Sequence, residues 1–457
     1  DLHASSLQQL WITDIYAFLV AGLLVTMGTL GDRIGRRRLL LLGAAAFGLA
    51  SVAAAQARTA EALIAARALL GIAGATLAPS TLSLIRNMFL DPRQRTLAFG
   101  VWVSSYSTGS AIGPLLGGLV LQHFRWGAVF LLGVPVMALL LIAGPILLPE
   151  SRDPTPRRLD LGSAALSLLA VLSVILGMKM AVQDGWGGLP AAAVTAGLGF
   201  GAWFVRRQRR MPHPLIDLSL FRAQAFSASL GIYLLATLTT FGSYVVVGQY
   251  LQLVTGLSPL GAGLRMLPWS GSYIVGSLLT PALARRVRPA FLMTGGLLLA
   301  ALGFAALPAM MTLGVGGIMA ASTLYSLGMA PVFTLGTEMI VGSAPPEQAG
   351  AAAAISETSS EMGGALGIAV LGSIGTAVYR ARLGASGLTG GGSAAFDTLG
   401  GATAAAAHLS AAEGTRLLQL ARDAFTHAVQ VTAAICAVVS ILTAGAVLAT
   451  LRAVQKH

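Results

Sequence analysis

The stretch Gly28-Thr-Leu-Gly-Asp-Arg-Ile-Gly-Arg-Arg-Arg38 (GTLGDRIGRRR) decides the fold of this chain. It is a short basic connection between two apolar runs, residues 10–30 and 39–57, and each run is long enough to cross a bilayer as a helix. Because Asp32 and four arginines crowd this connection, it must lie in water. The positive-inside rule then places it in the cytoplasm.

The composition is that of an integral membrane protein. Of the 457 residues, 55 % are hydrophobic and only 10 % are charged, and the mean hydropathy is +0.78. A soluble domain carries roughly 25 % charged residues. The net charge of +12 could suggest nucleic acid, but the basic residues lie in connections between apolar runs, which reflects topology. We therefore expect a lipid bilayer around the chain and no nucleic-acid partner.

Thirteen apolar runs follow one another along the chain. Continuous runs of this length predict helices and exclude a closed β-barrel, so we expect an all-α membrane protein. The runs are residues 10–30, 39–57, 62–86, 96–121, 126–148, 161–182, 188–205, 225–253, 260–284, 290–309, 313–336, 350–379 and 425–451.

Basic residues set the orientation of these runs. If residue 1 lies outside, the inner connections carry 20 of the 29 basic residues and the outer connections carry 6. The remaining three, Arg67, Lys179 and Arg265, fall inside runs. A bias of this size indicates that alternate connections, beginning with residues 31–38, face the cytoplasm.

The second half of the chain repeats the layout of the first. Residues 23–39 and 277–293 are both apolar and then basic, as parallel half-repeats are. One further run, 225–253, precedes the second copy, whereas no run precedes residue 10. We therefore expect a fourteen-span protein of which this chain holds thirteen spans, the first span being absent.

Three parts are expected. Residues 1–148 form an N-terminal bundle with five of its six spans, residues 149–222 add two spans with cytoplasmic linkers, and residues 223–457 form a six-span bundle. An outer segment, 380–424, precedes the last span; it contains a helix-like stretch, His408–Ala424. We interpret this segment as an interfacial helix or hairpin rather than a substrate gate.

The basic stretch also resembles a family signature. In the major facilitator superfamily, the connection between the second and third spans reads Gly-x-Leu-(Ala/Gly)-Asp-Arg-x-Gly-Arg-(Arg/Lys), and this chain meets every fixed position. The resemblance implies the major facilitator fold, in which two pseudo-symmetric six-helix bundles rock around a central cavity, here with two extra central helices. The residues implied in that conformational change are Gly28, Gly31, Asp32, Arg33, Gly35, Arg36 and Arg37.

A second glycine motif, Gly109-Ser-Ala-Ile-Gly-Pro-Leu-Leu-Gly-Gly118, lies in the run 96–121. Small residues four apart allow close helix packing, and the proline permits a bend, so a packing seam alone would explain it. It also resembles the fifth-span motif Gly-x-x-x-Gly-Pro-x-x-Gly-Gly, which within the superfamily marks proton-coupled exporters. The motif residues are Gly109, Gly113, Pro114, Gly117 and Gly118.

Arg67 lies inside the run 62–86. An arginine there costs roughly 2.5–3.5 kcal/mol on insertion scales, so it should face a watery cavity or an acid, unless it snorkels to the surface. The surrounding run resembles the family's fourth-span motif, whose arginine is implicated in proton coupling. Where that motif has a glutamine this chain has Leu70, so no glutamine role carries over.

Asp14 follows Trp11 in the first run. A carboxylate within a span is a candidate proton carrier or cation attractor, the alternative being a solvated acid at the interface. The 14-span drug antiporters resemble the chain here too, since they carry an aspartate after a tryptophan in this span.

Glu357 and Glu361 lie four residues apart and share one helix face. Two neighbouring carboxylates in a poorly solvated cavity raise each other's proton affinity, so the pair can exchange a proton for a cation. The pair matches an acidic pair in this span of the 14-span drug exporters; a polar helix end is the alternative. We expect Asp14, Arg67, Glu357 and Glu361 to couple protons.

Substrate contacts are expected from the three acids, Asp14, Glu357 and Glu361, and from three aromatic residues, Tyr250, Trp269 and Tyr273, whose faces suit lipophilic cations. Packing is the alternative for each ring. Some relatives have an acid in the span 260–284 that admits dications, and this chain has none. The six histidines are scattered without a ligand spacing, so neither a metal site nor a cofactor is expected, nor an enzyme.

The nearest group is the 14-span drug:proton antiporter family of EmrB/QacA-type multidrug efflux pumps. The resemblance implies a secondary active transporter of the bacterial plasma (inner) membrane, acting as a monomer. It would export hydrophobic, mainly monovalent cations such as quaternary ammonium compounds and dyes, driven by the proton gradient. The alternatives are an exporter of a host metabolite or antibiotic and a transport-inactive membrane sensor or scaffold.

Overall fold

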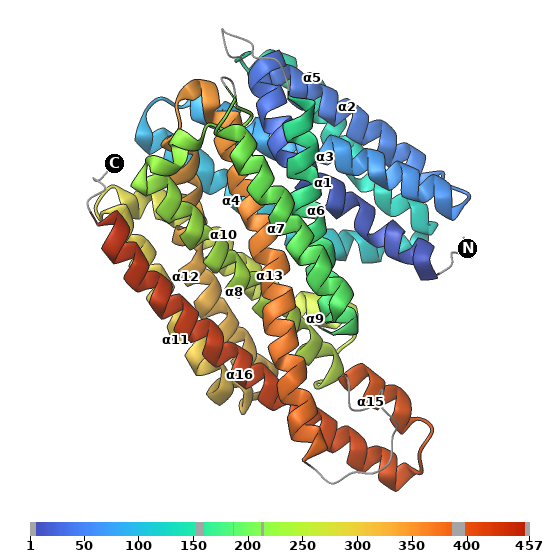
Figure 1. Cartoon of the computed structure of the whole chain (residues 1–457). Coiled ribbons are helices and arrows are strands. Elements are labelled where there is room, and N and C mark those ends of the chain that lie inside the picture. The colour runs from blue at the N-terminus through green and yellow to red at the C-terminus, as the bar shows by residue number, and fades with distance from the viewer. Residues whose placement is uncertain (1–5, 152–159, 186, 212–213, 386–397, 453–457) are drawn as a thin grey trace.

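The computed structural model describes residues 6–151, 160–185, 187–211, 214–385 and 398–452 (Figure 1). Within these ranges the side chains of Asp14 and Pro114 lie outside the described part. The described chain consists of helices and their connections, and every apolar run falls in a helix or a pair of consecutive helices, as expected from continuous hydrophobicity.

The helices follow one another in three groups. The first group is α1 (Ser6–Ile34), α2 (Arg36–Ala55), α3 (Ala60–Met88), α4 (Pro92–His123), the 3-10 helix η1 (Trp126–Gly133) and α5 (Val134–Leu147). The central pair is α6 (Leu161–Asp184) and α7 (Gly188–Gln208). The third group is η2 (Leu218–Arg222), α8 (Gln224–Leu253), α9 (Pro259–Arg265), α10 (Leu267–Ala284), α11 (Pro289–Met311), α12 (Gly314–Gly342), η3 (Pro346–Gln348), α13 (Ala349–Gly384), α15 (Leu399–Ala406) and α16 (Ala411–Leu451).

Ten described helical segments are long and apolar enough to cross a membrane. The predicted spans outside this set lie in α4, in α6 and in the pair α9 and α10. With 32 residues α4 is about 48 Å long at 1.5 Å per residue, so it can also cross despite its serines and glycines. The count of thirteen spans stays a prediction.

The basic stretch 28–38 is almost entirely helical, although the sequence predicted a loop there. Helix α1 continues to Ile34 and α2 begins at Arg36, so Gly35 alone connects them. Its φ of 109° lies in the region that only glycine adopts without strain. A single glycine therefore reverses the chain between the first two described spans.

The helices gather into two groups (Figure 1). Helices α1, α2, α3 and α5 lie together on the right of the view, and α8, α10, α11, α12 and α16 lie on the left. Helix α4 belongs by sequence to the first group, but it packs chiefly against α10 of the second. Helix α13 packs on both groups, because it contacts α1 and α3 as well as α8 and α16. Helices α4 and α13 therefore join the two groups.

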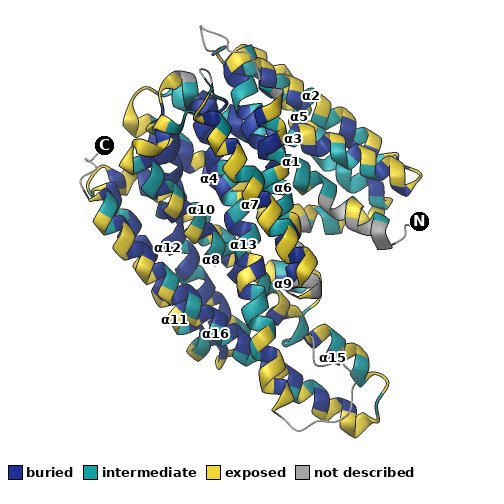
Figure 2. Cartoon of the chain, in the orientation of Figure 1, coloured by how far each residue is buried: buried dark blue, intermediate teal, exposed yellow. Residues whose placement is uncertain are grey.

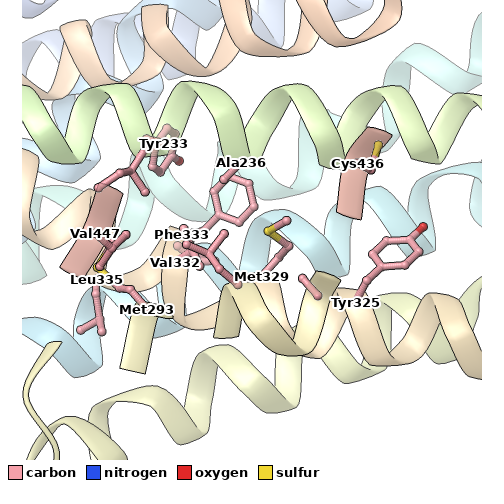
Figure 3. Close-up of a cluster of buried hydrophobic side chains, with 14 of the residues drawn as sticks. Tyr233, Ala236, Met293, Tyr325, Met329, Val332, Phe333, Leu335, Cys436 and Val447 are labelled. Carbon is pink, nitrogen blue, oxygen red and sulfur yellow. The ribbon is translucent and has the colours of Figure 1, made fainter. Parts of the chain in front are cut away.

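The largest apolar core lies mainly within the second group; it includes Tyr233, Met329, Phe333 and Cys436, which are labelled in Figure 3. The ring centroids of Tyr233 and Phe333 are 5.1 Å apart in an edge-to-face arrangement. Such aromatic pairs add about 0.5–1.5 kcal/mol beyond their buried area. Buried aromatic contacts of this kind stabilise the second group.

The central pair lies on the outside of the molecule. Helix α7 packs on α6, and α6 packs on α1 and α13. Only 17 % of the span in α7 is buried, against 72 % of that in α12, and exposed residues follow α7 in Figure 2. At the cytoplasmic end Arg207 Nε donates a 2.9 Å hydrogen bond to Asp160 Oδ2 and so ties the two helices together.

The outer segment forms a helical extension. The stretch predicted as a helix over 408–424 begins at Ala411 and continues without a break into the last span, which makes α16 41 residues long. Short α15 packs on it, and Figure 1 shows both beside the end of α13. The extension has its own small core, which includes Tyr379, Leu399 and Leu417.

Candidate functional site

At the cytoplasmic ends, Asp32 joins the two helix groups. Its Oδ1 accepts hydrogen bonds from Arg36 Nη2 at 2.6 Å and from the backbone N–H of Gly350 at 3.1 Å. Its Oδ2 accepts one from the N–H of Ala351 at 3.2 Å. The acid thus caps the N-terminus of α13, where the helix dipole favours a negative charge. Asp32 is 7 % exposed and Arg36 only 1 %.

The neighbouring arginines hold the same end of the molecule together. Arg36 Nη2 also donates to the carbonyl of Pro346 at 2.6 Å, just before α13. Glu150, at the end of the first group, accepts from the backbone N–H groups of Arg37 and Arg38 at 3.2 Å each. Of the predicted conformational motif, Asp32 and Arg36 therefore contact the second group, while Arg37 is held within the first.

Close glycine contacts accompany these bonds. A Cβ added to Gly28 would overlap the carbonyl oxygen of Gly350 and the Cβ of Ala354, so α1 and α13 touch by their backbones. Gly100 of α4 meets α10 in the same way, since its Cβ would lie 2.8 Å from the carbonyl oxygen of Ser277. Glycine allows this approach because it has no side chain.

A buried acid adds a further link. Glu338 of α12 is 2 % exposed, and its Oε2 accepts a 2.7 Å hydrogen bond from the hydroxyl of Thr96 on α4. Arg95 Nε lies 3.8 Å from the other carboxylate oxygen. The cytoplasmic ends of the two groups are thus joined by polar contacts at two separate places.

The second glycine motif lies in the outer half of α4 and makes no such approach. A Cβ added to Gly109, Gly113, Gly117 or Gly118 would meet no atom of the described residues within 4 Å. The close-packed seam that the motif predicts is therefore not formed in this conformation. The two groups are joined at their cytoplasmic ends, whereas the face of α4 that carries these four glycines is open.

The acidic pair lies on α13 between the joined and the open parts. At 1.5 Å per residue, Glu357 is about 12 Å and Glu361 about 18 Å from the start of the helix at Ala349. Glu357 is partly buried, and its buried Oε1 has no hydrogen-bond partner in the described part of the protein. Glu361 is exposed. An unsatisfied carboxylate oxygen at this depth marks a functional candidate.

Tyrosines surround the pair. The Tyr106 hydroxyl of α4 lies within electrostatic range of both carboxylates, and that of Tyr16 on α1 within range of Glu361. Tyr233 of α8 lies within range of Glu357. Tyr106 is 61 % exposed, so the space that it shares with the acids is open. Four helices therefore contribute ionisable groups to one region.

Arg67 contacts Tyr16, one of these tyrosines. Its guanidinium carbon lies 5.5 Å from the centroid of the Tyr16 ring and 6.0 Å from that of Phe130, which are cation–π distances. Tyr16 is also within electrostatic range of Glu361, so it interacts with both the predicted arginine and the predicted acid. Arg67 is partly buried among aromatic rings, and its guanidinium packs on them.

The other predicted site residues lie in different parts of the structure. Asp14 lies on α1 two residues before Tyr16, but its side chain is outside the described residues. Tyr273 packs against Phe333 at 5.9 Å, on the side of Tyr233. Tyr250 and Trp269 are buried in the large core, where Trp269 lies 5.4 Å from Tyr325.

Three tyrosines of the site, Tyr16, Tyr106 and Tyr233, were not singled out from the sequence. The available signal was a phenol in the interior of an apolar run, where a hydroxyl needs a partner. That signal cannot tell which of the eight tyrosines lie near the acids. The described residues contain no cluster of three or more histidine, cysteine, aspartate or glutamate side chains that could hold a metal.

Comparison with known proteins gives close relatives. The chain is 45 % identical over 450 residues to the multidrug efflux pump LfrA of Mycolicibacterium smegmatis, covering 98 % of this chain and 89 % of that protein. It is 38 % identical over 307 residues to the methyl viologen resistance protein SmvA of Salmonella typhimurium, covering 66 % of this chain and 61 % of that one.

A third relative is the tetracenomycin C resistance and export protein of Streptomyces glaucescens, 36 % identical over 307 residues, or 66 % of this chain and 56 % of that one. Among solved structures, the human organic anion transporter MFSD10 (TETRAN) aligns with a TM-score of 0.63 over 96 % of this chain and 83 % of its own. At 15 % identity this likeness shows the fold alone.

These relatives indicate a transporter rather than an enzyme, and a multi-pass protein of the plasma membrane with bacterial efflux and resistance proteins among its homologues. The family model that matches, the Major Facilitator Superfamily, covers residues 1–368, so the predicted superfamily is confirmed. With its helical fold, its signature stretch and this match in agreement, the chain belongs to the major facilitator superfamily.

Proposed function

We propose that this protein is a proton-coupled antiporter that exports hydrophobic, mainly monovalent cationic drugs by alternating access. The observation that carries the proposal is the acidic pair on α13. Glu357 has a buried carboxylate oxygen without a partner in the described residues, and Glu361 lies one turn further on, facing open space. Such a pair can hold a proton or attract a cation, which is the choice an exchanger needs.

The surroundings suit a lipophilic cation. Tyr16 and Tyr106 lie near the acids, and Tyr233 and Tyr273 continue the aromatic lining toward Phe333. Aromatic faces attract cations by about 0.5–2 kcal/mol each, more where water is excluded. Asp14 and Arg67 are proposed to share in the proton coupling, with Tyr16 within electrostatic range of both Arg67 and Glu361.

The transport cycle follows from these parts. A cation enters from the inner side to the deprotonated acids, the cytoplasmic contacts of Asp32 then form, and protons arriving from outside displace the cation. One proton exchanged for one monovalent cation moves no net charge. A tenfold proton gradient then supplies about 1.4 kcal/mol of uphill pumping.

The names of the relatives support export of drugs, and the arrangement of α6 and α7 beside two larger helix groups supports the 14-span drug:proton antiporter family. The chain covers 89 % of LfrA but less than two thirds of SmvA and of the tetracenomycin exporter. A monomeric state stays a prediction.

The test is transport by the purified protein in liposomes. Ethidium movement is followed by fluorescence under an imposed pH difference, with and without a protonophore. We expect gradient-driven movement that the protonophore abolishes. Glu357→Gln removes a charge-assisted contact of about 1.5–3 kcal/mol, so it should slow coupled transport by roughly 10- to 100-fold.

The matched control neutralises an acid elsewhere. Asp423 is exposed on α16 in the outer extension, so Asp423→Asn should transport like the wild type. Coupled transport that survives in both Glu357→Gln and Glu361→Gln would refute the site. Ethidium movement without any dependence on pH would refute the proton coupling, and no movement at all would favour a sensor or scaffold.

A second candidate function is export of a natural product. Two relatives, the tetracenomycin C exporter and a probable actinorhodin transporter of Streptomyces coelicolor, favour it. A panel of ethidium, methyl viologen and neutral or anionic polycyclic aromatics separates the two. Preference for the neutral or anionic compounds would replace the cation exporter by this candidate.

A further inference from the structure

A groove on the outside of the molecule has no part in the proposed cycle. It lies between α6 and α7, and Met362 of α13 contributes to its lining. Its volume is about 880 Å³, within the range of about 300–1,000 Å³ that ligand pockets occupy. The walls are apolar and mostly small, among them Ala170, Gly197 and Gly201.

The groove runs from the cytoplasmic surface into the middle of the membrane. Along α7 its lining extends from Arg206 back to Gly197, about 14 Å at 1.5 Å per residue, and Arg209 and Arg210 follow just after the helix. At the deep end the helices close, since a Cβ on Gly197 would lie 2.7 Å from Val174. The groove therefore reaches through about one leaflet and ends there.

Three arginines line the cytoplasmic mouth. Arg206, Arg209 and Arg210 are exposed, and none forms an ion pair within the described residues. Their neighbour Arg207 differs, because it is hydrogen-bonded to Asp160. The mouth thus carries three positive charges beside an apolar slot.

The positive charges at the mouth and the apolar walls together indicate which kind of ligand the groove can bind. A cationic drug would be repelled at the mouth, and a free anion would leave the apolar slot empty. An anionic phospholipid matches both parts, since its phosphate can accept from arginine and its acyl chain can fill the slot. The positive-inside rule explains arginines at this end of α7 but does not require a slot beside them.

We propose that this groove binds an anionic diacyl phospholipid of the inner leaflet. Its phosphate lies against Arg206, Arg209 and Arg210, and one acyl chain lies between α6 and α7 toward Met362. The bound lipid fills the space between the central pair and α13 and so stabilises the attachment of α7, which otherwise packs on α6.

The test measures lipid binding to the purified, delipidated chain by native mass spectrometry. The probes are dioleoyl phosphatidylglycerol and dioleoyl phosphatidylcholine, which differ in head-group charge. We expect the wild type to prefer phosphatidylglycerol. Changing Arg206, Arg209 and Arg210 together to glutamine should weaken its binding by roughly 100-fold, because each arginine near an anionic lipid contributes about fivefold.

Matched controls separate site binding from general attraction. Arg285, Arg286 and Arg288 are equally exposed at the cytoplasmic end of α10, outside the groove, so their triple glutamine variant should bind like the wild type. Gly201→Leu should block the slot, because a Cβ there meets only Ala170 at 3.9 Å and the side chain can extend into the groove. Gly199→Leu, on the same helix but not in the lining, should not.

Equal binding of both lipids by the wild type would overturn the proposal, and that comparison needs no variant. Equal loss in the two triple variants would reduce the effect to general charge attraction and would also overturn it. So would equal binding by Gly201→Leu and Gly199→Leu.

Discussion

Two acids, Asp32 of α1 and Glu357 of α13, lie along the first three turns of α13, and their hydrogen bonding differs. At the start of α13, the Asp32 carboxylate from α1 accepts bonds from Gly350, Ala351 and Arg36. Two turns later, Glu357 has a buried oxygen with no partner in the described part of the chain. The first acid is satisfied and holds two helix groups together; the second is left available. A paired acid fixes a conformation, whereas an unpaired one can bind a proton or a cation.

The largest expected effect on stability comes from replacing the hydrogen-bonded acid, Asp32. Asp32→Asn removes the charge that Arg36 and the α13 N-terminus share, and leaving a buried charge unpaired costs about 3 kcal/mol. We expect a clear fall in the melting temperature in detergent. Asp423→Asn is the control, since that acid is exposed in the outer extension. A melting temperature like the wild type's would show that the contact at Asp32 does not hold the groups together.

The next effect compares the two glycine motifs. Gly28→Ala places a Cβ against Gly350 and Ala354, and overpacking of this kind costs about 1–3 kcal/mol. Gly113→Ala has open space and should be neutral or stabilising by about 0.5–1 kcal/mol, because alanine favours helix. Melting temperatures of the two variants, measured side by side, check this. Equal destabilisation would mean that the outer half of α4 is packed after all.

Glu357→Gln should behave opposite to Asp32→Asn. Removing an unsatisfied buried charge should leave the melting temperature unchanged or raise it. The free energy of unfolding should rise by at most about 1 kcal/mol. Its loss of coupled transport then cannot be attributed to unfolding. A strongly destabilised Glu357→Gln would place this acid in the same structural class as Asp32.

The smallest effect concerns the central pair. The hydrogen bonds from Arg207 lower the pKa of Asp160 from 3.8 to about 2. A carboxyl group with a lowered folded-state pKa stabilises the protein above its unfolded-state pKa, and this contribution is lost as the pH falls toward 2. Asp160→Asn should therefore melt slightly below the wild type at pH 5, and the difference should vanish between about pH 4 and 2. A difference that persists at pH 2 would contradict the assignment.

Much of the fold could be predicted from the sequence. Long apolar runs must become helices in a bilayer, because no water is there to satisfy the backbone, and arginines stay on the cytoplasmic side. The stretch 28–38 identified the superfamily. The prediction of a loop there was wrong, because helix α1 extends to Ile34 and helix α2 begins at Arg36. Charged residues in a sequence indicate contact with water, but they do not show where a helix ends.

The candidate site was predictable only in part. Glu357, Glu361 and Arg67 stand out because charge inside an apolar run is costly. Tyr16 and Tyr106 do not, since a tyrosine in a helix can pack or bind equally well.

Local composition therefore determined which segments form long apolar helices and which charges are out of place. The tertiary structure decided what those charges meet. Asp32 caps a helix that begins more than 300 residues later in the chain, at Ala349, and Tyr16 interacts with both Arg67 and Glu361. Hydropathy is a property of neighbouring residues, whereas a hydrogen bond or an open cavity depends on how distant helices pack.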